Sequence, residues 1–409
     1  MDLRSSPLFW PRQSPAPPSY PPLREDALCD VAIIGAGLAG AMVAHELTSA
    51  GLDCIIVDKR SPGCGSTAAS TALLLYDLDV PLHKLAGRIG TAAAERCYRI
   101  GLEAMGAIEQ LAGTLPDKCG FARRPSLYLA SNGNQAAMLH KEAAARQRAG
   151  ITAQLLTGDQ VRSRHSFTAP AAILSHGAVV DGYHLAHALL RASLNLRVHS
   201  GTRIAKAIRA SSGHWQAVTD DGHTITCKRL VLAAGYEASQ VLRVPGRIVS
   251  TYAVATSPLS SFKGWEDRCL IWETAHPYLY IRDTPDGRAM IGGGDEPITD
   301  PKDRDQLITE KCRELLRRFR DMFPDIRAEP EVEWAGFFIE TDDGLPYIGE
   351  PQPGLYLALC YGANGTTFAA AAARIIRELI RGQPSPDAAL FGLGRKVGPG
   401  VGVGSSPLH

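Results

Sequence analysis

The segment Gly35-Ala36-Gly37-Leu38-Ala39-Gly40 constrains the fold of this chain more than any other feature. It follows a continuous apolar run, 30–34, of the kind that is buried on both faces of a parallel sheet. It also opens an alanine-rich stretch, 38–50, that is expected to be helical. The next expected strand, 54–57, ends at Asp58, 18 residues after Gly40. This order is the strand–turn–helix–strand context that a dinucleotide-binding fingerprint requires.

Each part of the fingerprint has a physical role. Glycines let the backbone approach a pyrophosphate, and the start of the following helix supplies unpaired N–H groups and the positive end of the helix dipole. The Asp58 carboxylate is placed to accept hydrogen bonds from ribose hydroxyls. The alternative is an ordinary turn between a strand and a helix that binds no ligand.

Two later segments indicate which dinucleotide is bound. Leu230–Gly235 and Leu357–Gly362 are further apolar runs that end in glycine, and Gly362-Ala363-Asn364-Gly365 precedes an expected helix over 366–381. A second glycine-rich helix start suits a ligand longer than one nucleotide. No second G-x-G-x-x-G occurs, so no separate NAD domain is expected. The sequence therefore favours FAD.

The remaining pattern alternates helices and strands, which predicts an α/β protein. Helices are expected over 83–112, 136–149 and 304–322; strands over 203–218, 223–232 and 355–359; and a β-rich region over 251–292 with a hairpin turn at Asp286-Gly287. Residues 1–28, which hold seven prolines, are expected to form an extended arm. Its Phe9, Trp10 and Tyr20 should pack partly on the body. Residues 394–409 are expected to form a flexible tail.

Composition narrows the cellular setting. The chain has 43 Lys and Arg against 42 Asp and Glu, which predicts no nucleic-acid or anionic-membrane partner. Its nine cysteines form no C-x-x-C pair, so neither a metal cage nor a disulfide framework is expected. Scattered cysteines favour a cytoplasmic location. No apolar run approaches the ~18 residues of a membrane span, so no transmembrane segment is expected.

Ordered motifs extend along most of residues 29–393. Besides the fingerprint they are Gly65-Ser66-Thr67 with Ser70, Val179–Asp181, Leu232–Tyr236, Asp286–Arg288 with Ile291–Gly293, Trp334–Gly336, Thr341–Gly349 and Gly362–Gly365. In this order they resemble the D-amino-acid-oxidase-type FAD-dependent oxidoreductases, the family that includes glycine oxidase, sarcosine oxidase and gamma-glutamylputrescine oxidase. The resemblance implies a Rossmann-like FAD-binding domain with a mostly parallel sheet, interleaved with an antiparallel-sheet substrate domain. We expect the FAD-binding domain over 29–85, 178–250 and 337–393, and the substrate domain over 86–177 and 251–336.

The resemblance also implies particular FAD contacts. They are Gly35, Gly37, Leu38, Ala39 and Gly40 at the pyrophosphate; Asp58 and Lys59 at the ribose; Gly65, Ser66, Thr67 and Ser70 at the phosphate or ribityl chain; Ile204, through its backbone, at the adenine; Ala234, Gly235, Tyr236 and Gly344; and Gly362, Asn364, Gly365 and Thr366 on the isoalloxazine side. No family-typical attachment residue is found, so FAD is expected to be non-covalent. In this family the flavin N5 accepts a hydride from the carbon that bears the amine.

One departure from the family bears on the substrate. Aligned on the flanking motifs, Phe338 stands where amino-acid-oxidising members commonly carry an arginine for the substrate carboxylate. Arg282 is a candidate replacement, because Tyr278, Tyr280 and Arg282 share one face of an expected strand. Alternatively, Arg282 is a surface residue of the hairpin.

Acidic and aromatic residues indicate a cationic substrate. Asp295, Glu296 and Glu340 lie at the ends of expected strands, and Trp272, Tyr278 and Tyr280 belong to the same β-rich region. Carboxylates and ring faces attract a cationic amine. Alternatively, the rings pack in the sheet and the acids are solvated.

The function we expect is oxidation of the C–N bond of an amine or amino acid to an imine, with Arg282, Tyr278, Tyr280 and Glu340 as the candidate catalytic residues. The electron acceptor is oxygen, a quinone or a partner protein. Alternatives are oxidation of a 2-hydroxy acid or polyol, or a flavin-bearing subunit without its own turnover.

Overall fold

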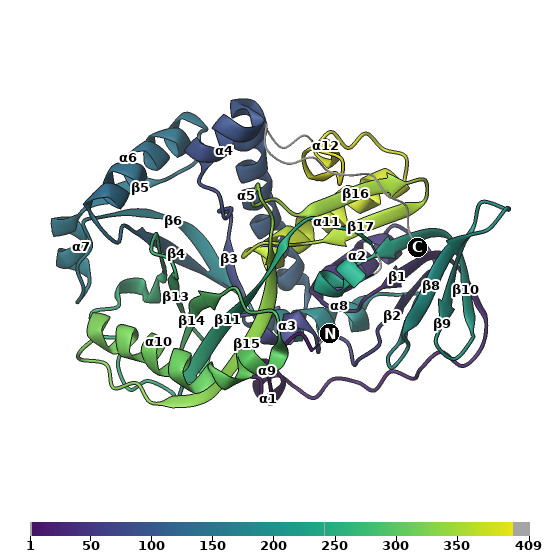
Figure 1. Ribbon diagram of the computed structural model, residues 1–409, viewed down its shortest axis with the longest axis horizontal. Coiled ribbons are helices and arrows are strands. Elements are labelled where there is room, and N and C mark those ends of the chain that lie inside the picture. Colours follow the sequence, from purple (N-terminus) through teal and green to yellow (C-terminus); the bar gives the residue numbers. More distant parts are fainter. Residues whose placement is uncertain (1, 241, 396–409) are drawn as a thin grey trace.

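Two β-sheets, built from interleaved segments of the chain, organise the computed structural model, which describes residues 2–240 and 242–395 (Figure 1). The first sheet has the strand order β16-β17-β10-β1-β2-β7, and β8 and β9 join it at β10. Its strands are β1 (Ala27–Ile34), β2 (Cys54–Val57), β7 (Leu196–His199), β8 (Ile204–Arg209), β9 (Trp215–Thr219), β10 (Thr224–Leu232), β16 (Tyr347–Gln352) and β17 (Leu355–Leu359). From β17 to β7 all neighbouring strands are parallel. The apolar runs of the sequence form these parallel strands because both faces of this sheet are covered.

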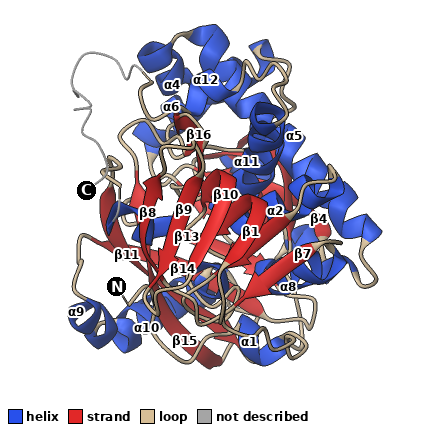
Figure 2. Cartoon of the chain, turned by 90° about the vertical axis from the view of Figure 1, so that its right-hand side faces the viewer, coloured by secondary structure: helices blue, strands red, loops and turns tan. Residues whose placement is uncertain are grey.

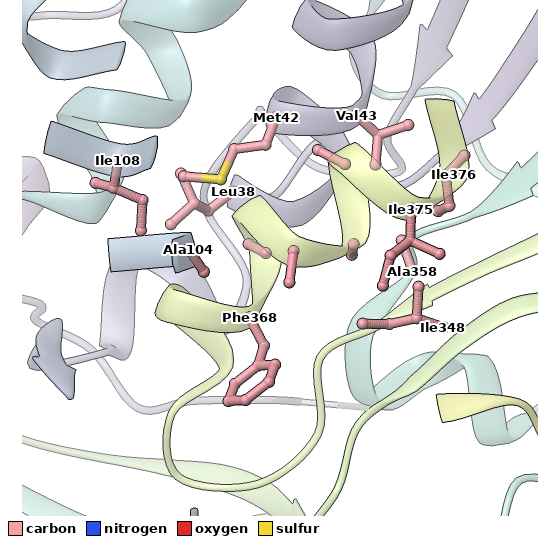
Figure 3. Close-up of a cluster of buried hydrophobic side chains, with 14 of the residues drawn as sticks. Leu38, Met42, Val43, Ala104, Ile108, Ile348, Ala358, Phe368, Ile375 and Ile376 are labelled. Atoms are coloured by element: carbon pink, nitrogen blue, oxygen red, sulfur yellow. The ribbon is translucent and has the colours of Figure 1, made fainter. Parts of the chain in front are cut away.

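Helices cover one face of the first sheet. α2 (Leu38–Ser49), α5 (Thr91–Thr114), α8 (Gly182–Ala192) and α11 (Gly365–Ile380) share one hydrophobic core with β1, β16 and β17. Figure 3 shows Met42 and Val43 of α2, Ile108 of α5, and Phe368 and Ile375 of α11 within this core. The other face packs against the β8–β9 hairpin, which Figure 2 shows beside β10 and β1. α2, the helix that follows the glycine turn, packs against α8 and α11 as well as against the sheet.

The second sheet has the order β15-β11-β14-β13-β12-β4-β6-β3, with β5 on β6. Its strands are β3 (Leu73–Leu75), β4 (Ala122–Leu129), β5 (Gln154–Thr157), β6 (Ala171–Val179), β11 (Arg247–Thr256), β12 (Leu270–Glu273), β13 (Leu279–Asp283), β14 (Ala289–Glu296) and β15 (Pro330–Glu340). Every pair is antiparallel except β4 with β12. α10 (Ile308–Met322) packs its apolar side on this sheet. The two expected kinds of sheet are both present.

The other helical segments are short, except α6. They are α1 (Trp10–Gln13), α3 (Ser66–Ala69), α4 (Leu82–Ile89), α6 (Gly133–Arg148), α7 (Gly158–Arg164), α9 (Pro301–Gln306) and α12 (Ala388–Phe391), with 3-10 turns η1 (Lys118–Gly120), η2 (Gly235–Gln240) and η3 (Glu266–Arg268). No helix among the described residues combines the length and the apolar character needed to cross a membrane.

Several sequence-based boundaries need correction. The helix expected over 83–112 is divided into α4 and α5 at Gly90, whose φ of +88° a continuous helix does not allow. The single strand expected over 203–218 is the β8–β9 hairpin. Likewise, α9 and α10 replace one helix over 304–322. The hairpin turn at Asp286-Gly287 is confirmed, since β13 and β14 pair on either side of it.

The expected domain boundaries differ from the packing in two places. β3 lies within the segment 29–85, which we assigned to the FAD-binding domain, but it pairs with β6 of the second sheet. α5 lies within 86–177, which we assigned to the substrate domain, but it packs in the core of the first sheet. Both differences have the same cause. The periodicity of apolar residues indicates that a segment is buried, but it does not indicate which of the two sheets the segment packs against.

The N-terminal arm packs on the body, as expected. Arg4 forms a bridge with Gly336 of β15, and Phe9 and Trp10 are buried. The Trp10 indole donates a hydrogen bond to the backbone oxygen of Ser70 (2.7 Å). The arm is thus tied to the segment that follows α3. At the other end, residues 396–409 of the expected tail lie outside the described residues.

Replacing Trp10 by Phe tests this tie. Trp10→Phe keeps a ring in the buried site but leaves the Ser70 carbonyl without its donor, so the free energy of unfolding should fall by about 1–3 kcal/mol. Chemical denaturation at saturating FAD measures it. The control is Arg12→Ala, at an exposed position of the same helix, which should change stability by less than about 0.5 kcal/mol. Equal effects of the two variants would contradict the structural role of the indole.

Candidate functional site

The glycine turn between β1 and α2 is built so tightly that two of its glycines cannot be replaced. A Cβ atom on Gly35, whose φ is +105°, would lie 2.4 Å from the Ala233 carbonyl oxygen at the end of β10. A Cβ atom on Gly40 would lie 1.9 Å from the oxygen of Gly35. Gly35 therefore allows the turn to pass the neighbouring strand, and Gly40 allows α2 to approach it.

The turn also presents unpaired donors. Among the described residues, the backbone N–H groups of Gly37, Ala39 and Gly40 have no hydrogen-bond partner, whereas that of Leu38 donates to the Thr67 hydroxyl (3.0 Å). Unpaired N–H groups at a helix start are the donors that bind a pyrophosphate. The predicted phosphate contact thus has the donors it needs.

Asp58, at the end of β2, supports the glycine turn directly. Its carboxylate accepts hydrogen bonds from the backbone N–H groups of Ala36 (2.8 Å) and Arg60 (2.8 Å). Burial raises the pKa of Asp58, and these two hydrogen bonds oppose that rise. A carboxylate has about four lone-pair positions, so two remain for other donors. The contact with ribose stays a prediction.

Ion pairs join the ends of β2 and β10 beside Asp58. The Lys59 ammonium lies 2.7 Å from Glu237, and the Arg60 guanidinium lies 2.8 Å from the same carboxylate. Glu237 belongs to η2, which also contains Gly235 and Tyr236, whereas Ala234 lies between β10 and η2. Ile204 begins β8 and pairs with Thr219 of β9.

The segment after β2 contributes a buried hydroxyl without a partner. Ser66 Oγ is buried and has no hydrogen-bond partner among the described residues. Ser66 and Thr67 lie in α3, directly after Gly65, while the Ser70 hydroxyl accepts from the backbone N–H of Ala72 (3.1 Å). A buried polar atom without a partner in the chain is a candidate contact for a ligand. Ser66 therefore fits the expected phosphate or ribityl contact.

The second glycine turn, before α11, is held by two aspartates. A Cβ atom on Gly362 would lie 2.9 Å from Asp79 Oδ2, and one on Gly365 would lie 2.5 Å from the Cys360 oxygen. The backbone N–H of Ala363 donates to Asp79 (3.2 Å), and the Asn364 amide donates to the backbone oxygen of Asp77 (2.8 Å). The turn is therefore fixed in shape by residues 77–79.

Other predicted positions meet this turn. Gly344 (φ +71°) faces Val80, since a Cβ atom there would lie 3.1 Å from the Val80 nitrogen. The Tyr361 hydroxyl donates to the Gly235 oxygen (3.2 Å), which brings η2 to the end of β17. Thr366 lies in the first turn of α11. The carboxyl ends of the parallel strands thus gather most of the predicted FAD-binding residues, where parallel sheets bind their ligands.

Carboxylates and rings of the second sheet lie near the second glycine turn. Part of Asp79 is exposed to solvent, but protein surrounds its carboxyl group. This burial raises the pKa of Asp79 to about 7, and the negative charges of Glu340 and Asp295 contribute to the rise. Burial likewise raises the pKa of Asp295 to about 6, an effect that the neighbouring Thr251 and Tyr278 hydroxyls reduce. The site is acidic and only partly compensated.

The aromatic residues divide into two groups. Tyr278 and Tyr280 have ring centroids 6.0 Å apart, and the charges of Asp295 and Asp79 help to raise the pKa of Tyr278 far above its ordinary value, after burial as the main cause. Trp272 is instead stacked on Tyr128 at 3.6 Å within the second sheet. Of these three aromatic residues, only Tyr278 and Tyr280 therefore lie near the Asp295 carboxylate.

Two further acidic residues that the sequence placed near the substrate, Glu340 and Glu296, form ion pairs with basic residues. Glu340 forms an ion pair with Arg247 (3.2 Å), and Glu296 pairs with Lys311. Phe338, at the position where the family commonly has an arginine, is buried in β15.

For Arg282, the structure contradicts one of the two interpretations from the sequence. The residue is fully buried, so it is not a surface residue of the hairpin. Its Nη1 donates to the backbone oxygens of Thr71 (2.8 Å), Ala72 (2.9 Å) and Val180 (2.9 Å). Its Nε donates to the Asp283 oxygen (2.8 Å), and the guanidinium lies over the Trp10 ring. Arg282 is a buried cross-link between these segments, its Nη2 has no hydrogen-bond partner among the described residues, and a contact with the substrate stays a prediction.

Asp77 and Asp79 were missed by the analysis of the sequence. A signal existed: two acidic residues alternate with apolar ones directly after the apolar run 73–75. Acidic residues after a strand are common in ordinary loops, however, so the pattern alone did not separate them from solvated ones.

Two surface hollows lie away from this site. Each has a volume of about 440 Å³, and both are lined by Asp30 and Asp53 near the amino ends of β1 and β2. Ligands of parallel sheets bind at the opposite ends of the strands, so neither hollow is a candidate for the cofactor.

Comparison with known proteins agrees with this geometry. A family model described as FAD dependent oxidoreductase, DAO, matches residues 30–379. The chain belongs to the DAO family. FAD is the cofactor of this family, and the unpaired donors of the first glycine turn together with the Ser66 hydroxyl fit it.

Three DAO relatives are similar over most of the chain. Glycine oxidase of Geobacillus kaustophilus is 26% identical and covers 91% of this chain and 98% of its own. Its solved structure superposes with a TM-score of 0.73 at 21% identity over 91% of this chain and all of that one. Gamma-glutamylputrescine oxidoreductase of Escherichia coli is 26% identical, with 88% of this chain and 85% of that protein covered. A bifunctional tRNA 5-methylaminomethyl-2-thiouridine biosynthesis protein of Cupriavidus necator is 27% identical, with 87% of this chain but 57% of that protein covered.

Proposed function

We propose that this chain oxidises the C–N bond of a cationic amine, or of an amino acid with a modified amine, to an imine. The observation that carries the proposal is the pair Asp79 and Asp295 beside Tyr278, near the second glycine turn. Bound FAD would supply the hydride acceptor for this oxidation. We propose further that FAD is held without a covalent bond.

The chain's own residues would bind and orient the amine. Tyr278 and Tyr280 offer ring faces to a cation, and the Asp295 carboxylate, with a pKa of about 6, is charged at neutral pH and able to accept a proton from the ammonium group. Phe338 in place of an arginine removes a charge-assisted contact worth about 1.5–3 kcal/mol to a substrate carboxylate. The contacts available to a cation, together with the missing arginine for a carboxylate, favour an amine over an unmodified amino acid.

The names of two relatives support the class of substrate. Glycine oxidase is named for an amino acid, and gamma-glutamylputrescine oxidoreductase for a modified amine. We place the protein in the cytoplasm, supported by its nine free cysteines. Oxygen, a quinone or a partner protein remains the proposed electron acceptor.

Anaerobic reduction of the flavin tests the proposal. The purified holoprotein is mixed without oxygen with single members of a panel: primary and secondary amines, D- and L-amino acids, and 2-hydroxy acids. An amine should bleach the visible flavin absorbance and release ammonia or a smaller amine in proportion. If only hydroxy acids bleached the flavin, the protein would oxidise a C–O bond and the proposal would be wrong. If no compound bleached it, the protein would be a flavin-bearing subunit without its own turnover.

Binding of a permanently charged amine should depend on pH. Both carboxyl groups are protonated well below pH 6 and charged above pH 7, so the affinity for a quaternary ammonium compound should rise from pH 5 to pH 8. We expect a gain of about tenfold or more from each carboxylate. Titration of the flavin spectrum measures it.

Matched variants locate this pH dependence. Asp295→Asn should remove the part of the rise near pH 6, whereas Asp159→Asn, at an exposed position of α7, should leave the whole curve unchanged. A pH-independent affinity in the unmodified protein would contradict a carboxylate site for the amine.

A further inference from the structure

A group of three metal-ligating side chains lies outside the site described above. Oxygen, sulfur and nitrogen atoms of Asp117, Cys119 and His184 all lie within 4.8 Å of one another. Asp117 and Cys119 belong to the turn that leads into β4, and His184 lies in the first turn of α8. The group therefore joins the entry to the second sheet with a helix of the first.

The backbone of the turn is held in an unusual shape that directs Cys119 inward. Lys118, Cys119 and Gly120 have φ values of +53°, +50° and +65°, so two consecutive residues with side chains adopt the left-handed region. Such conformations cost about 1–3 kcal/mol each and persist only where the surroundings impose them. A strained turn that buries a thiol beside a carboxylate and an imidazole suggests a use for the geometry.

Hydrogen bonds fix the ligand-bearing elements to one another. The Asp117 carboxylate accepts from the backbone N–H of Cys119 (3.1 Å), and the Cys119 oxygen accepts from the N–H of Asp181 (2.9 Å). Asp181 caps α8 by accepting from the N–H of His184 (2.8 Å). The positions of all three ligands thus depend on rigid backbone contacts and not on flexible side chains alone.

The donor set and its spacing suit a zinc ion. Zinc binds thiolate sulfur at about 2.3 Å and imidazole nitrogen at about 2.0 Å, which in tetrahedral geometry separates the two donors by about 3.5 Å. Here the Cys119 sulfur and the His184 nitrogen lie within 4.8 Å of each other, His184 Nε2 lies 3.1 Å from Asp117 Oδ2, and Cys119 Sγ lies 3.5 Å from Asp117 Oδ1. Side-chain rotations that bring the sulfur and nitrogen atoms to about 3.5 Å from each other would complete the coordination.

The three ligands are not all buried, so a metal ion can reach the group from solvent. Cys119 is buried, whereas 52% of the Asp117 side chain is exposed. An ion could enter from the Asp117 side, and a water molecule would occupy the fourth position. We propose that Asp117, Cys119 and His184 bind one zinc ion, or a similar borderline-soft divalent cation, which fastens η1 to α8.

The binding step balances without any redox change. The cation replaces the proton of the Cys119 thiol, which leaves to water, and it binds the neutral imidazole of His184 at Nε2. Without metal, the Cys119 thiol donates a hydrogen bond to Asp117 (3.5 Å), and His184 Nε2 lies 3.1 Å from the same carboxylate.

Metal analysis of the holoprotein tests the proposal. After dialysis against a chelator, zinc is added, the excess is removed and zinc per chain is measured, with one ion per chain expected. Cobalt is then added in place of zinc, and ligand-field absorption of tetrahedral cobalt with a thiolate ligand should appear at wavelengths beyond the flavin bands. Both readouts are independent of the oxidation of any substrate.

Three variants assign the ligands. Asp117→Asn, Cys119→Ser and His184→Ala should each weaken zinc binding by at least about 10- to 100-fold, as much as loss of an outer-shell partner costs. The matched controls Asp159→Asn, Cys29→Ser and His176→Ala should bind zinc as the unmodified chain does. Because Asp117 is exposed, its variant should fold and keep its FAD content even if Cys119→Ser does not. No bound zinc, or equal binding in all variants, would overturn the proposal.

Discussion

Replacing Asp58 by alanine should weaken FAD binding by roughly 10- to 150-fold. The Asp58 carboxylate has two roles. It accepts hydrogen bonds from the backbone N–H groups of Ala36 and Arg60, and its remaining lone pairs are available to the predicted ribose hydroxyls. Loss of charge-assisted hydrogen bonds costs about 1.5–3 kcal/mol, which is the stated range in affinity. Loss of the bond to Ala36 also leaves the first glycine turn less rigid, so both effects act in the same direction.

Titration of FAD into the variant apoprotein measures this effect. Its melting temperature should become strongly dependent on added FAD, because binding to the native state stabilises by mass action. Turnover at saturating FAD should change little, since the isoalloxazine lies at the far end of the cofactor.

Asp53 provides the matched control on the same strand. It lies just before β2, at the end opposite Asp58, where it pairs with Arg197 at the surface. Asp53→Ala should leave the FAD affinity unchanged. If Asp58→Ala also left it unchanged, Asp58 would be an ordinary residue at the end of a strand.

Removal of Arg146 should produce the largest loss of stability, about 3–5 kcal/mol. Its guanidinium is buried, 2.5 Å from Asp77 and 2.8 Å from Glu142, and it also donates to the Tyr76 hydroxyl (2.9 Å). Arg146→Ala would leave two buried carboxyl groups without their cation. The backbone oxygen of Asp77 accepts a hydrogen bond from the Asn364 amide, so a shift of residue 77 should also disorder the second glycine turn.

Chemical denaturation of the FAD-saturated protein measures this loss. The control is Arg162→Ala in α7, which breaks an exposed pair with Asp159 and should cost less than about 0.5 kcal/mol. A cost for Arg146→Ala as small as that of the control would contradict the importance of the buried pair.

The same cluster predicts a sensitivity to acid. Although burial opposes it, the hydrogen bond to His83 and the charge of Arg146 hold the pKa of Glu142 at about 2. A carboxyl group with a depressed pKa in the folded state stabilises the fold above its unfolded value of about 4.3. This stabilisation should therefore be lost as the pH falls from about 4 to about 2, and Glu142→Gln should lose that part of the acid dependence.

The sequence by itself determined the parts of the fold that depend on neighbouring residues. The strand, glycine turn and helix around Gly35–Gly40 are as expected, as are the hairpin turn at Asp286-Gly287 and the helix after Gly365. Each of these has a strong local cause: a buried apolar run, a backbone conformation that favours glycine, or an unpaired helix start. The order of the motifs also indicated the DAO family, which the family model confirms.

Only the tertiary structure decided which distant residues share an environment. Arg282 looked suitable for a substrate, but carbonyl groups of residues 71, 72 and 180 surround it. No sequence pattern assigned a role to Asp79, but it holds the turn at Ala363, 284 residues away in sequence. The physical reason is that the role of a charged group depends on its burial and its partners, and these are set by contacts between segments that no local pattern of the sequence encodes.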